Sequence, residues 1–451
     1  MKISFYGGTE TVTGSKFLLE TKHTKVLVDC GLFQGYKALR ERNRQLLPFE
    51  LGSLDAVLLT HAHLDHSGYI PVLYKQGFRG PVYTHHATKD LCKILLPDSG
   101  HIQESDARFY AKHRISKHSD PQPLYDKITA EQSLTLFNPV NFEEKVTLGD
   151  IAFWLQPAGH ILGAASVIVE AEGKRVGFSG DIGRPDDIFM KPPQPLPALD
   201  LLLLESTYGN RRHDEGDVFE QVENIVNETV KQGGILLVPA FAVGRAQVLQ
   251  HILATLIKEK RIPKIPVYLD SPMAINASDI YCRYTDEHRL NEKDCELMCS
   301  MTTYTQKVDE SKALATINYP HIIIAGSGMA TGGRILHHFK RLLGDSRTRV
   351  LFAGYQAGGT RGDKMLSGVQ SIKIHGAWIP IKAQVHMLSG LSGHGDYVDI
   401  ENWLTSSSIT AKTQIKLVHG SPDALEGMRD YLNYHALLNP IIATDKQTIS
   451  L

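Results

Sequence analysis

The first 60 residues alternate short apolar runs with turn residues, and the same texture returns between residues 146 and 209. Each run contains β-branched or aromatic residues and is bounded by Gly, Thr or Asp, which is typical of strands in an open sheet packed on one face. The runs lie at 2–8, 15–21, 24–31, 54–63, 146–160, 163–181 and 199–209. Helical spacing of apolar positions appears instead at 67–77 and 85–114. We therefore expect two layers of sheet with helices outside, an α/β architecture.

The pattern changes beyond Gly209. A helix is expected over 216–233, because Asp217 can cap its start and Gly233 can end it. A strand, a glycine-containing turn, a helix and another strand then follow one another at 234–270, and this succession recurs at 320–356. Such βαβ successions predict a separate domain with a parallel sheet.

Composition and charge narrow the class of protein. Of 451 residues, 42% are hydrophobic and 22% charged, as expected for a globular chain with a sizeable core. No apolar run approaches the ~18 residues of a membrane span. Residues 1–8 enter a strand at once and leave no room for a signal segment. We therefore expect no membrane partner. The five cysteines are odd in number and scattered, which favours a reducing cytoplasm over a disulfide framework. The net charge of −1 leaves a nucleic-acid partner open.

Three histidines and one aspartate crowd into the six positions 61–66, at the end of an apolar run. Imidazole nitrogens and carboxylate oxygens are the usual protein ligands of zinc. His61 and His63 can point the same way from extended backbone, and Asp65 and His66 can face a second position at the following turn. A helix start capped by Asp65, with solvated histidines, explains any one of these residues but explains the group poorly.

Three further residues of metal-ligand type end apolar runs elsewhere in the chain: His160, Asp181 and His419. Open α/β layers place their sites at the carboxyl ends of strands. One such residue alone is more often a turn or cap residue, but several together predict a metal site. Glycines on both sides of Asp181 allow other backbone segments to approach it closely.

These residues carry a family resemblance. The stretch "THAHLDHSG" resembles the HxHxDH motif of the metallo-β-lactamase superfamily, and Asp29, His160 and Asp181 stand where its remaining motifs lie. Five blocks resemble those of the β-CASP nucleases, namely "LLLLESTYGNRRH", "VPAFAVGRAQ", "AGSGMATGGR", "GYQAGGTRG" and "SGLSGHGD". That branch includes the pre-mRNA 3′-end-processing endonuclease subunit and ribonucleases of bacteria and archaea. The resemblance implies a four-layer αββα metallo-β-lactamase domain built from 1–208 and 391–451, with a parallel α/β β-CASP domain inserted at 209–390.

The resemblance also implies two Zn²⁺ ions per chain. The implied ligands form one triad per zinc and a shared carboxylate: His61, His63 and His160 for the first zinc, Asp65, His66 and His419 for the second, and Asp181 between them. Asp29 would not bind zinc itself but would fix a loop or orient a ligand histidine. Two such ions can clamp a phosphate and supply a nucleophile near neutral pH.

The family motifs further imply the residues of proton transfer. Glu205 and His394 are expected to be catalytic together with Asp65: His394 would protonate the leaving oxygen, and Glu205 would raise the pKa of that imidazole. A structural carboxylate paired with an arginine is the alternative for Glu205. His419 stands where RNA-acting members carry histidine and DNA cross-link repair members carry valine, so RNA is the expected partner.

Two glycine-rich pieces, at 326–333 and 354–362, are candidate phosphate cradles at the starts of helices, although a tight turn explains either piece alone. The side chains expected to contact the RNA backbone are Ser327, Thr331, Arg211, Arg212 and Arg245. Solvated arginines are a common alternative.

The leading hypothesis is a zinc-dependent ribonuclease that hydrolyses phosphodiester bonds of single-stranded RNA, with endonuclease and 5′-exonuclease action both open. A thioesterase- or lactonase-type hydrolase would use the same metal site but needs no cleft of nucleic-acid size. A non-catalytic RNA-binding subunit is disfavoured, because the implied ligands, Glu205 and His394 are all present. A homodimer is compatible with the sequence.

Overall fold

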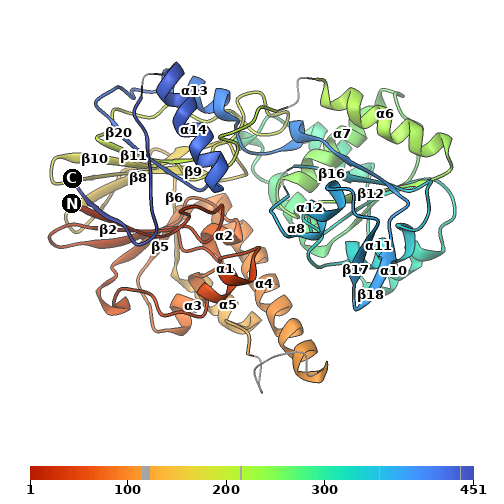
Figure 1. Cartoon of the computed structure of the whole chain (residues 1–451), viewed down its shortest axis with the longest axis horizontal. Coiled ribbons are helices and arrows are strands. Elements are labelled where there is room, and N and C mark those ends of the chain that lie inside the picture. Colours follow the sequence, from red (N-terminus) through yellow and green to blue (C-terminus); the bar gives the residue numbers. More distant parts are fainter. Residues whose placement is uncertain (114–121, 214–215, 355, 437) are drawn as a thin grey trace. The chain divides into compact units, whose positions relative to one another are not determined.

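The computed structural model describes residues 1–113, 122–213, 216–354, 356–436 and 438–451 (Figure 1). The chain divides into two compact units. Unit 1 comprises Met1–Arg212 and His394–Leu451, and unit 2 comprises His213–Gly393. These divisions lie near the expected domain boundaries after residues 208 and 390, which stay a proposal.

Unit 1 contains two sheets, each of seven described strands. The first has the order β22 (Thr448–Ser450), β1 (Lys2–Gly7), β2 (Lys16–Glu20), β3 (Lys25–Val28), β4 (Ala56–Leu58), β5 (Val82–His85) and β6 (Phe137–Val140). The second has the order β21 (Ile441–Ile442), β20 (Gln414–Val418), β11 (Leu201–Glu205), β10 (Lys174–Phe178), β9 (Ala165–Ala171), β8 (Ile151–Pro157) and β7 (Val146–Leu148). Because β22 pairs with β1 and β20 with β11, both ends of the chain complete these sheets.

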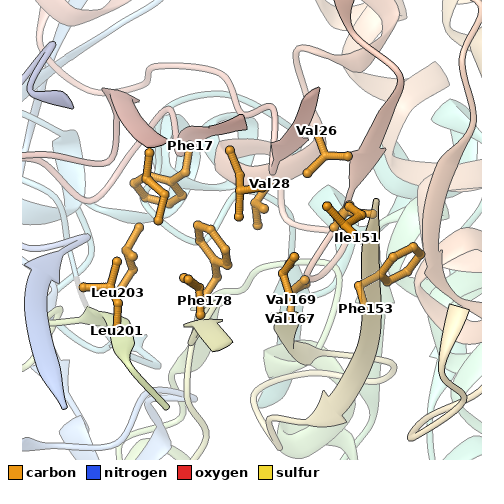
Figure 2. Packing of buried hydrophobic residues seen from close by; sticks show 14 of the residues in the cluster. Phe17, Val26, Val28, Ile151, Phe153, Val167, Val169, Phe178, Leu201 and Leu203 are labelled. Atoms are coloured by element: carbon orange, nitrogen blue, oxygen red, sulfur yellow. The ribbon is translucent and has the colours of Figure 1, made fainter. Parts of the chain in front are cut away.

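The two sheets of unit 1 pack face to face through an apolar core (Figure 2). Alternate residues of a strand share a face, so Val167 and Val169 of β9 point together towards Val28 of β3. Phe17 of β2 lies over Phe178 of β10, with ring centroids 6.1 Å apart. Burying one side chain of this size contributes about 1.5–3 kcal/mol to the free energy of unfolding. The packed core therefore holds in place the strand ends that carry the polar residues.

The helices of unit 1 lie outside the sheets (Figure 1). They are α1 (Lys37–Arg42), α2 (Leu64–Ser67), α3 (Ile70–Lys75), α4 (His86–His113), α5 (Lys127–Ser133), α13 (Tyr397–Ser406) and α14 (Pro422–His435). α4 contacts β5 and β6 of the first sheet, and α14 contacts β20 and β21 of the second. Helix, sheet, sheet and helix therefore form the four layers that the resemblance implies.

Unit 2 is built on a parallel sheet, as the βαβ successions predict. Its order is β14 (Thr303–Tyr304), β13 (Val267–Asp270), β15 (His321–Ala325), β12 (Ile235–Pro239), β16 (Arg349–Phe352) and β19 (Gln384–Met387). A separate antiparallel hairpin consists of β17 (Ser371–Ile374) and β18 (Ala377–Pro380).

The helices of unit 2 are α6 (Val218–Lys231), α7 (Arg245–Lys258), α8 (Pro272–Tyr281), α9 (Glu292–Ser300), α10 (Val308–Ala313), α11 (Ile335–Leu342) and α12 (Arg361–Leu366). α6 has the predicted ends. The carboxylate of Asp217 accepts a hydrogen bond from Phe219 N–H (2.8 Å), and Gly233 follows the helix with φ +66°.

The apolar pattern misses several short elements. The helix expected from residue 85 begins at His86, because His85 still belongs to β5, and its expected last residue, 114, lies outside the described residues. The pattern indicates neither β6 nor the β17–β18 hairpin, since four-residue strands give little periodicity. Among the helices of the described residues, none is long and apolar enough to cross a membrane.

Candidate metal centre

The six positions 61–66 lie where the chain passes from the buried strand β4 into the one-turn helix α2. His63 directly precedes α2, and Asp65 and His66 lie within it. The preceding strand, β3, leads to Gly31, which packs against this connection. A Cβ at Gly31 would lie 1.5 Å from the carbonyl oxygen of Asp65, so only glycine permits the approach.

A first group of ligand atoms comes from three separate connections of unit 1. Nδ1 of His63 lies 3.2 Å from Nε2 of His61 and 3.2 Å from Nε2 of His160. Oδ2 of Asp181 lies 3.4 Å from Nε2 of His61 and 3.6 Å from Nε2 of His160. The ligand atoms of a tetrahedral zinc site are about 3.3 Å apart, given zinc–ligand bonds of ~2.0–2.1 Å. This group therefore has the spacing of a zinc site.

A second group lies on the other oxygen of Asp181. Nε2 of His66 is 3.3 Å from Oδ1 of Asp181 and 3.1 Å from Nε2 of His419. Oδ2 of Asp65 is 3.6 Å from Nε2 of His419. Asp65, His66 and His419 thus each offer a ligand atom within 4.8 Å of the others. The two groups share Asp181, which presents one oxygen to each.

Asp181 provides the test of whether a metal fits. Its Oδ1 is buried, and within the described part of the chain it accepts no well-aligned hydrogen bond. Burying a carboxylate oxygen costs free energy unless a cation or a hydrogen-bond donor interacts with it. Because the surrounding donors are imidazole and carboxylate groups in zinc-like spacing, two divalent metals fit these residues.

Burial sets the protonation of most of the histidines. It lowers the pKa of His63 to about 3 and holds the pKa values of His61 and His160 below the ordinary value. Near pH 7 these three imidazoles are therefore neutral, the form that binds a metal. Burial also disfavours the charged form of His66, but the carboxylates of Asp181 and Asp29 outweigh it and raise the pKa of His66. Metal binding at His66 must therefore displace a proton.

Asp29 hydrogen-bonds to one of these histidines and is linked to a second through Thr60. Its Oδ2 accepts hydrogen bonds from His66 Nδ1 (2.6 Å) and from Thr60 Oγ1 (2.9 Å), and its Oδ1 accepts one from Thr60 N–H (2.8 Å). Thr60 Oγ1 also lies 3.0 Å from His61 Nδ1. By bonding to Nδ1, the carboxylate fixes the His66 ring with Nε2 facing Asp181. Through Thr60 it also restrains the ring of His61. Asp29 has φ +58°, a strained conformation for a residue other than glycine.

Sequence reasoning missed two threonines at this site. Thr60 lies between Asp29 and His61, and Oγ1 of Thr207 lies 3.1 Å from Nδ1 of His419. Their positions gave a usable signal: Thr60 directly precedes the histidine cluster, and Thr207 follows Glu205 by two residues.

We predict that Asp29→Asn lowers zinc affinity by about 10- to 100-fold. All three groups that bond to this carboxylate are donors, so the amide NH₂ of asparagine would face a donor and displace Thr60 or His66. Titration against a chromogenic zinc chelator measures the effect, with Asp55→Asn, an exposed aspartate of the same unit, as control. Equal affinities in the two variants would contradict an orienting role for Asp29.

Glu205 and His394 form an ion pair beside the metal-ligand residues. Oε1 of Glu205 lies 3.1 Å from Nδ1 of His394, so the partner of this carboxylate is a histidine rather than an arginine. Two backbone N–H groups also donate to Glu205, from Ile182 (2.8 Å) and Thr207 (3.0 Å). The His394 ring lies 4.4 Å from the His160 ring, centroid to centroid. The pair is therefore held in place against the first ligand group.

Each residue of the pair favours the charged form of the other. Burial alone would lower the pKa of His394, but the charge and hydrogen bond of Glu205 raise it. Burial alone would likewise raise the pKa of Glu205, and His394 holds it below its ordinary value. An imidazole with a raised pKa can remain protonated near neutral pH and act as an acid.

The expected phosphate contacts are placed as follows. Ser327 and Thr331 bond to each other through their hydroxyls (3.0 Å) before α11. Arg245 is buried and donates to the carbonyl of Leu391. Arg211 is exposed, with its guanidinium 5.7 Å from the ring centroid of Tyr208. Residue 355 of the second glycine-rich piece lies outside the described residues, and all of these contacts stay predictions.

A four-layer fold with two groups of imidazole and carboxylate side chains that could hold metal ions around one buried aspartate is typical of a metallo-hydrolase. Comparisons with known families narrow this class. The chain matches the metallo-beta-lactamase superfamily over residues 12–219, the Beta-Casp domain over 246–365 and the Zn-dependent metallo-hydrolase RNA specificity domain over 378–442. With the relatives described next, these matches show that the chain belongs to the β-CASP family of metal-dependent hydrolases.

Three proteins illustrate the relationship. Ribonuclease TTHA0252 of Thermus thermophilus is 36% identical, covering 94% of each chain. Transcription termination factor FttA of Methanocaldococcus jannaschii is 31% identical over 93% of this chain and 67% of its own length. A crystal structure of a protein of unknown function from Enterococcus faecalis V583 matches with a TM-score of 0.55 and 15% identity, covering 100% of this chain and 99% of that one. The last similarity concerns the fold alone.

Proposed function

We propose that this chain is a zinc-dependent ribonuclease that hydrolyses phosphodiester bonds of single-stranded RNA. The observation that carries the proposal is the arrangement around Asp181. One oxygen of this buried carboxylate faces His61 and His160, the other faces His66 and His419, and the acid pair of Glu205 and His394 lies alongside.

The proposed ligands follow this arrangement. His61, His63 and His160 would hold one zinc, Asp65, His66 and His419 would hold the other, and Asp181 would bind both. When bound, two zinc ions would stabilise charge on the phosphate and supply a nucleophile near neutral pH.

The chain's own residues supply the rest of the mechanism. The buried Asp181 and Asp29 lie against the imidazoles and would hold them in fixed directions. Nδ1 of His394 bonds to Glu205, and we assign the transfer of a proton to the leaving oxygen to Nε2 of the same ring. Glu205 stays ionised, since two backbone N–H groups and His394 all donate to it. It thereby keeps the acid in its protonated form.

RNA is the favoured substrate for two reasons. The RNA specificity domain matches residues 378–442, and the relative from Thermus thermophilus carries the name ribonuclease. A thioesterase or lactonase would use the same metal groups but would not account for this match. We further propose a cytoplasmic location and a homodimer.

The purified, zinc-loaded chain should cut single-stranded RNA and should lose this activity when a chelator removes the metal. The test uses the same RNA labelled near its 3′ end, with either a monophosphate or a triphosphate at the 5′ end, and a gel that resolves product lengths. Internal fragments from both substrates would identify an endonuclease. Progressive shortening of the monophosphate substrate alone would identify a 5′-exonuclease.

Two controls make this experiment decisive. Chelated protein that regains activity on zinc addition excludes a contaminating metal-independent ribonuclease. A DNA oligonucleotide of the same sequence tests the preference for RNA. Failure to cut RNA, combined with hydrolysis of a thioester such as S-lactoylglutathione, would overturn the ribonuclease proposal.

A further inference from the structure

The β17–β18 hairpin of unit 2 has one apolar face and one exposed face. Ile372 and Ile374 are buried in the core of the unit. Lys373 lies between them in sequence and is exposed, directly opposite Trp378 on the neighbouring strand. Cross-strand partners project to the same side of a sheet, so the lysine and the indole lie side by side. Trp378 is 68% exposed, an uncommon state for the largest apolar side chain.

Helix α11 lies beside the tip of this hairpin (Figure 1). The rings of His337 on α11 and His375 in the hairpin turn are 4.9 Å apart, centroid to centroid. Lys340, one helical turn after His337, is also exposed. The two histidines therefore join the exposed face of α11 to that of the hairpin.

The charges around this junction are of one sign. The pKa of His375 is lowered by burial and then by the neighbouring His337, Lys340 and Arg361, all of which are cationic when charged. Arg361 also donates from Nε to the carbonyl of Lys373 (3.0 Å) and from Nη1 to the carbonyl of Thr331 (3.0 Å). It thereby anchors the hairpin to the glycine-rich loop at 326–333.

We propose that this surface binds single-stranded RNA, with Trp378 stacked on a base and the two lysines contacting backbone phosphates. We call it the hairpin patch and define it by His337, Lys340, Lys373, His375 and Trp378. Proteins that hold single strands without reading their sequence combine an exposed aromatic ring with cationic side chains along the backbone path. The uniform positive charge favours a polyanion over a protein partner, and the choice of RNA rests on the proposed function.

Binding is measured by fluorescence anisotropy of a labelled 30-nucleotide oligouridylate on the full chain in EDTA, so that no cleavage occurs. Trp378→Ala should weaken binding by about fivefold or more, because one stacked base is lost. Trp378→Phe, which keeps an aromatic face, should bind within about twofold of the native chain. Circular dichroism confirms that each variant is folded.

Intrinsic fluorescence supplies a second readout. Trp403 is buried, and Trp154 lies under Lys145 and Arg175 (5.5 and 5.7 Å), so Trp378 should dominate any change on RNA addition. Oligouridylate should quench the native chain, and the Trp378→Phe variant should bind without this quenching. Equal quenching in the two proteins would overturn the stacking proposal.

The phosphate contacts are tested with a charge-matched pair of variants. Lys340→Gln with Lys373→Gln removes two charges from the patch, and Lys258→Gln with Lys264→Gln removes two exposed charges elsewhere in unit 2. For the patch variant, the slope of log affinity against log salt should fall by about 1.4, since each phosphate contact to a single strand contributes about 0.7. Equal slopes for the two double variants would overturn the proposal.

Hydrolysis of a small phosphodiester can be tested independently of RNA binding at the hairpin patch. With zinc, hydrolysis of bis(p-nitrophenyl) phosphate by the native chain tests the proposed function alone, because this small diester offers no strand of nucleotides for the patch to hold. A native chain that binds oligouridylate through the patch but hydrolyses neither RNA nor this diester would overturn the proposed function alone. Patch variants that bind RNA normally but sediment as a smaller species would assign the patch to an interface between copies and overturn the RNA-binding proposal.

Discussion

Asp181→Asn is expected to lower kcat/KM for RNA by a factor on the order of a thousand, equivalent to about 4 kcal/mol of transition-state stabilisation. The carboxylate presents Oδ2 to His61 and Oδ1 to His66. Asparagine keeps only one acceptor oxygen, and its NH₂ group would face one of the two ligand groups. We therefore expect the bound zinc to fall from two ions per chain to one or fewer.

Metal analysis by mass spectrometry, on protein dialysed against a defined zinc concentration, measures this occupancy. Asp186→Asn is the matched control, because that aspartate lies five residues away with a side chain 66% exposed. It should retain both metals and full activity. Two zinc ions in Asp181→Asn, with activity unchanged, would contradict a shared ligand and the two-metal mechanism with it.

Much of the fold and the site could be predicted from the sequence, because the expected ligands mark strand ends. β4 leads to His61, β10 to Asp181 and β20 to His419. A buried strand produces a clear apolar run, and a polar residue of metal-ligand type where that run stops is visible without a structure. The helix caps follow from equally local chemistry, as at Asp217.

The missed features depend on contacts that are distant in sequence or on very short elements. Nothing local to Thr207 shows that its hydroxyl lies 3.1 Å from a ring 212 residues further along. The hairpin at 371–380 has four-residue strands, and only its packing distinguishes Ile372 and Ile374 from exposed positions. The division of Asp181 between two histidine groups likewise depends on how the ends of β4, β8, β10 and β20 come together, which spacing along the chain does not encode.

His394→Ala is expected to lower kcat for RNA by about 10²- to 10⁴-fold while both zinc ions remain bound. The imidazole is placed to protonate the leaving oxygen, and it is not among the proposed zinc ligands. Single-turnover hydrolysis of RNA, with metal analysis of the same samples, measures both quantities. His101→Ala, which removes an exposed imidazole from α4 of the same unit, should leave activity unchanged.

The pH dependence should identify Glu205 as the residue that keeps this acid protonated. An acid acts in its protonated form, so activity should fall as the pH rises through the pKa of His394. Glu205 raises that pKa by its charge and hydrogen bond. Glu205→Gln removes the charge, so the alkaline limb of the kcat profile should move to lower pH. Glu131→Gln, which removes an exposed carboxylate of the same unit, should leave the alkaline limb of the profile unchanged.

The leaving group distinguishes proton donation from a structural role. A ribonucleoside alkoxide needs a proton as the bond to phosphorus breaks, whereas p-nitrophenolate is stable without one. The defect of His394→Ala should therefore be large on RNA and small on bis(p-nitrophenyl) phosphate, because only the first reaction depends on the acid. Asp181→Asn should impair both reactions, since it disturbs the metal groups themselves. An equal loss on both substrates in His394→Ala would mean that this histidine holds the site together rather than donating the proton.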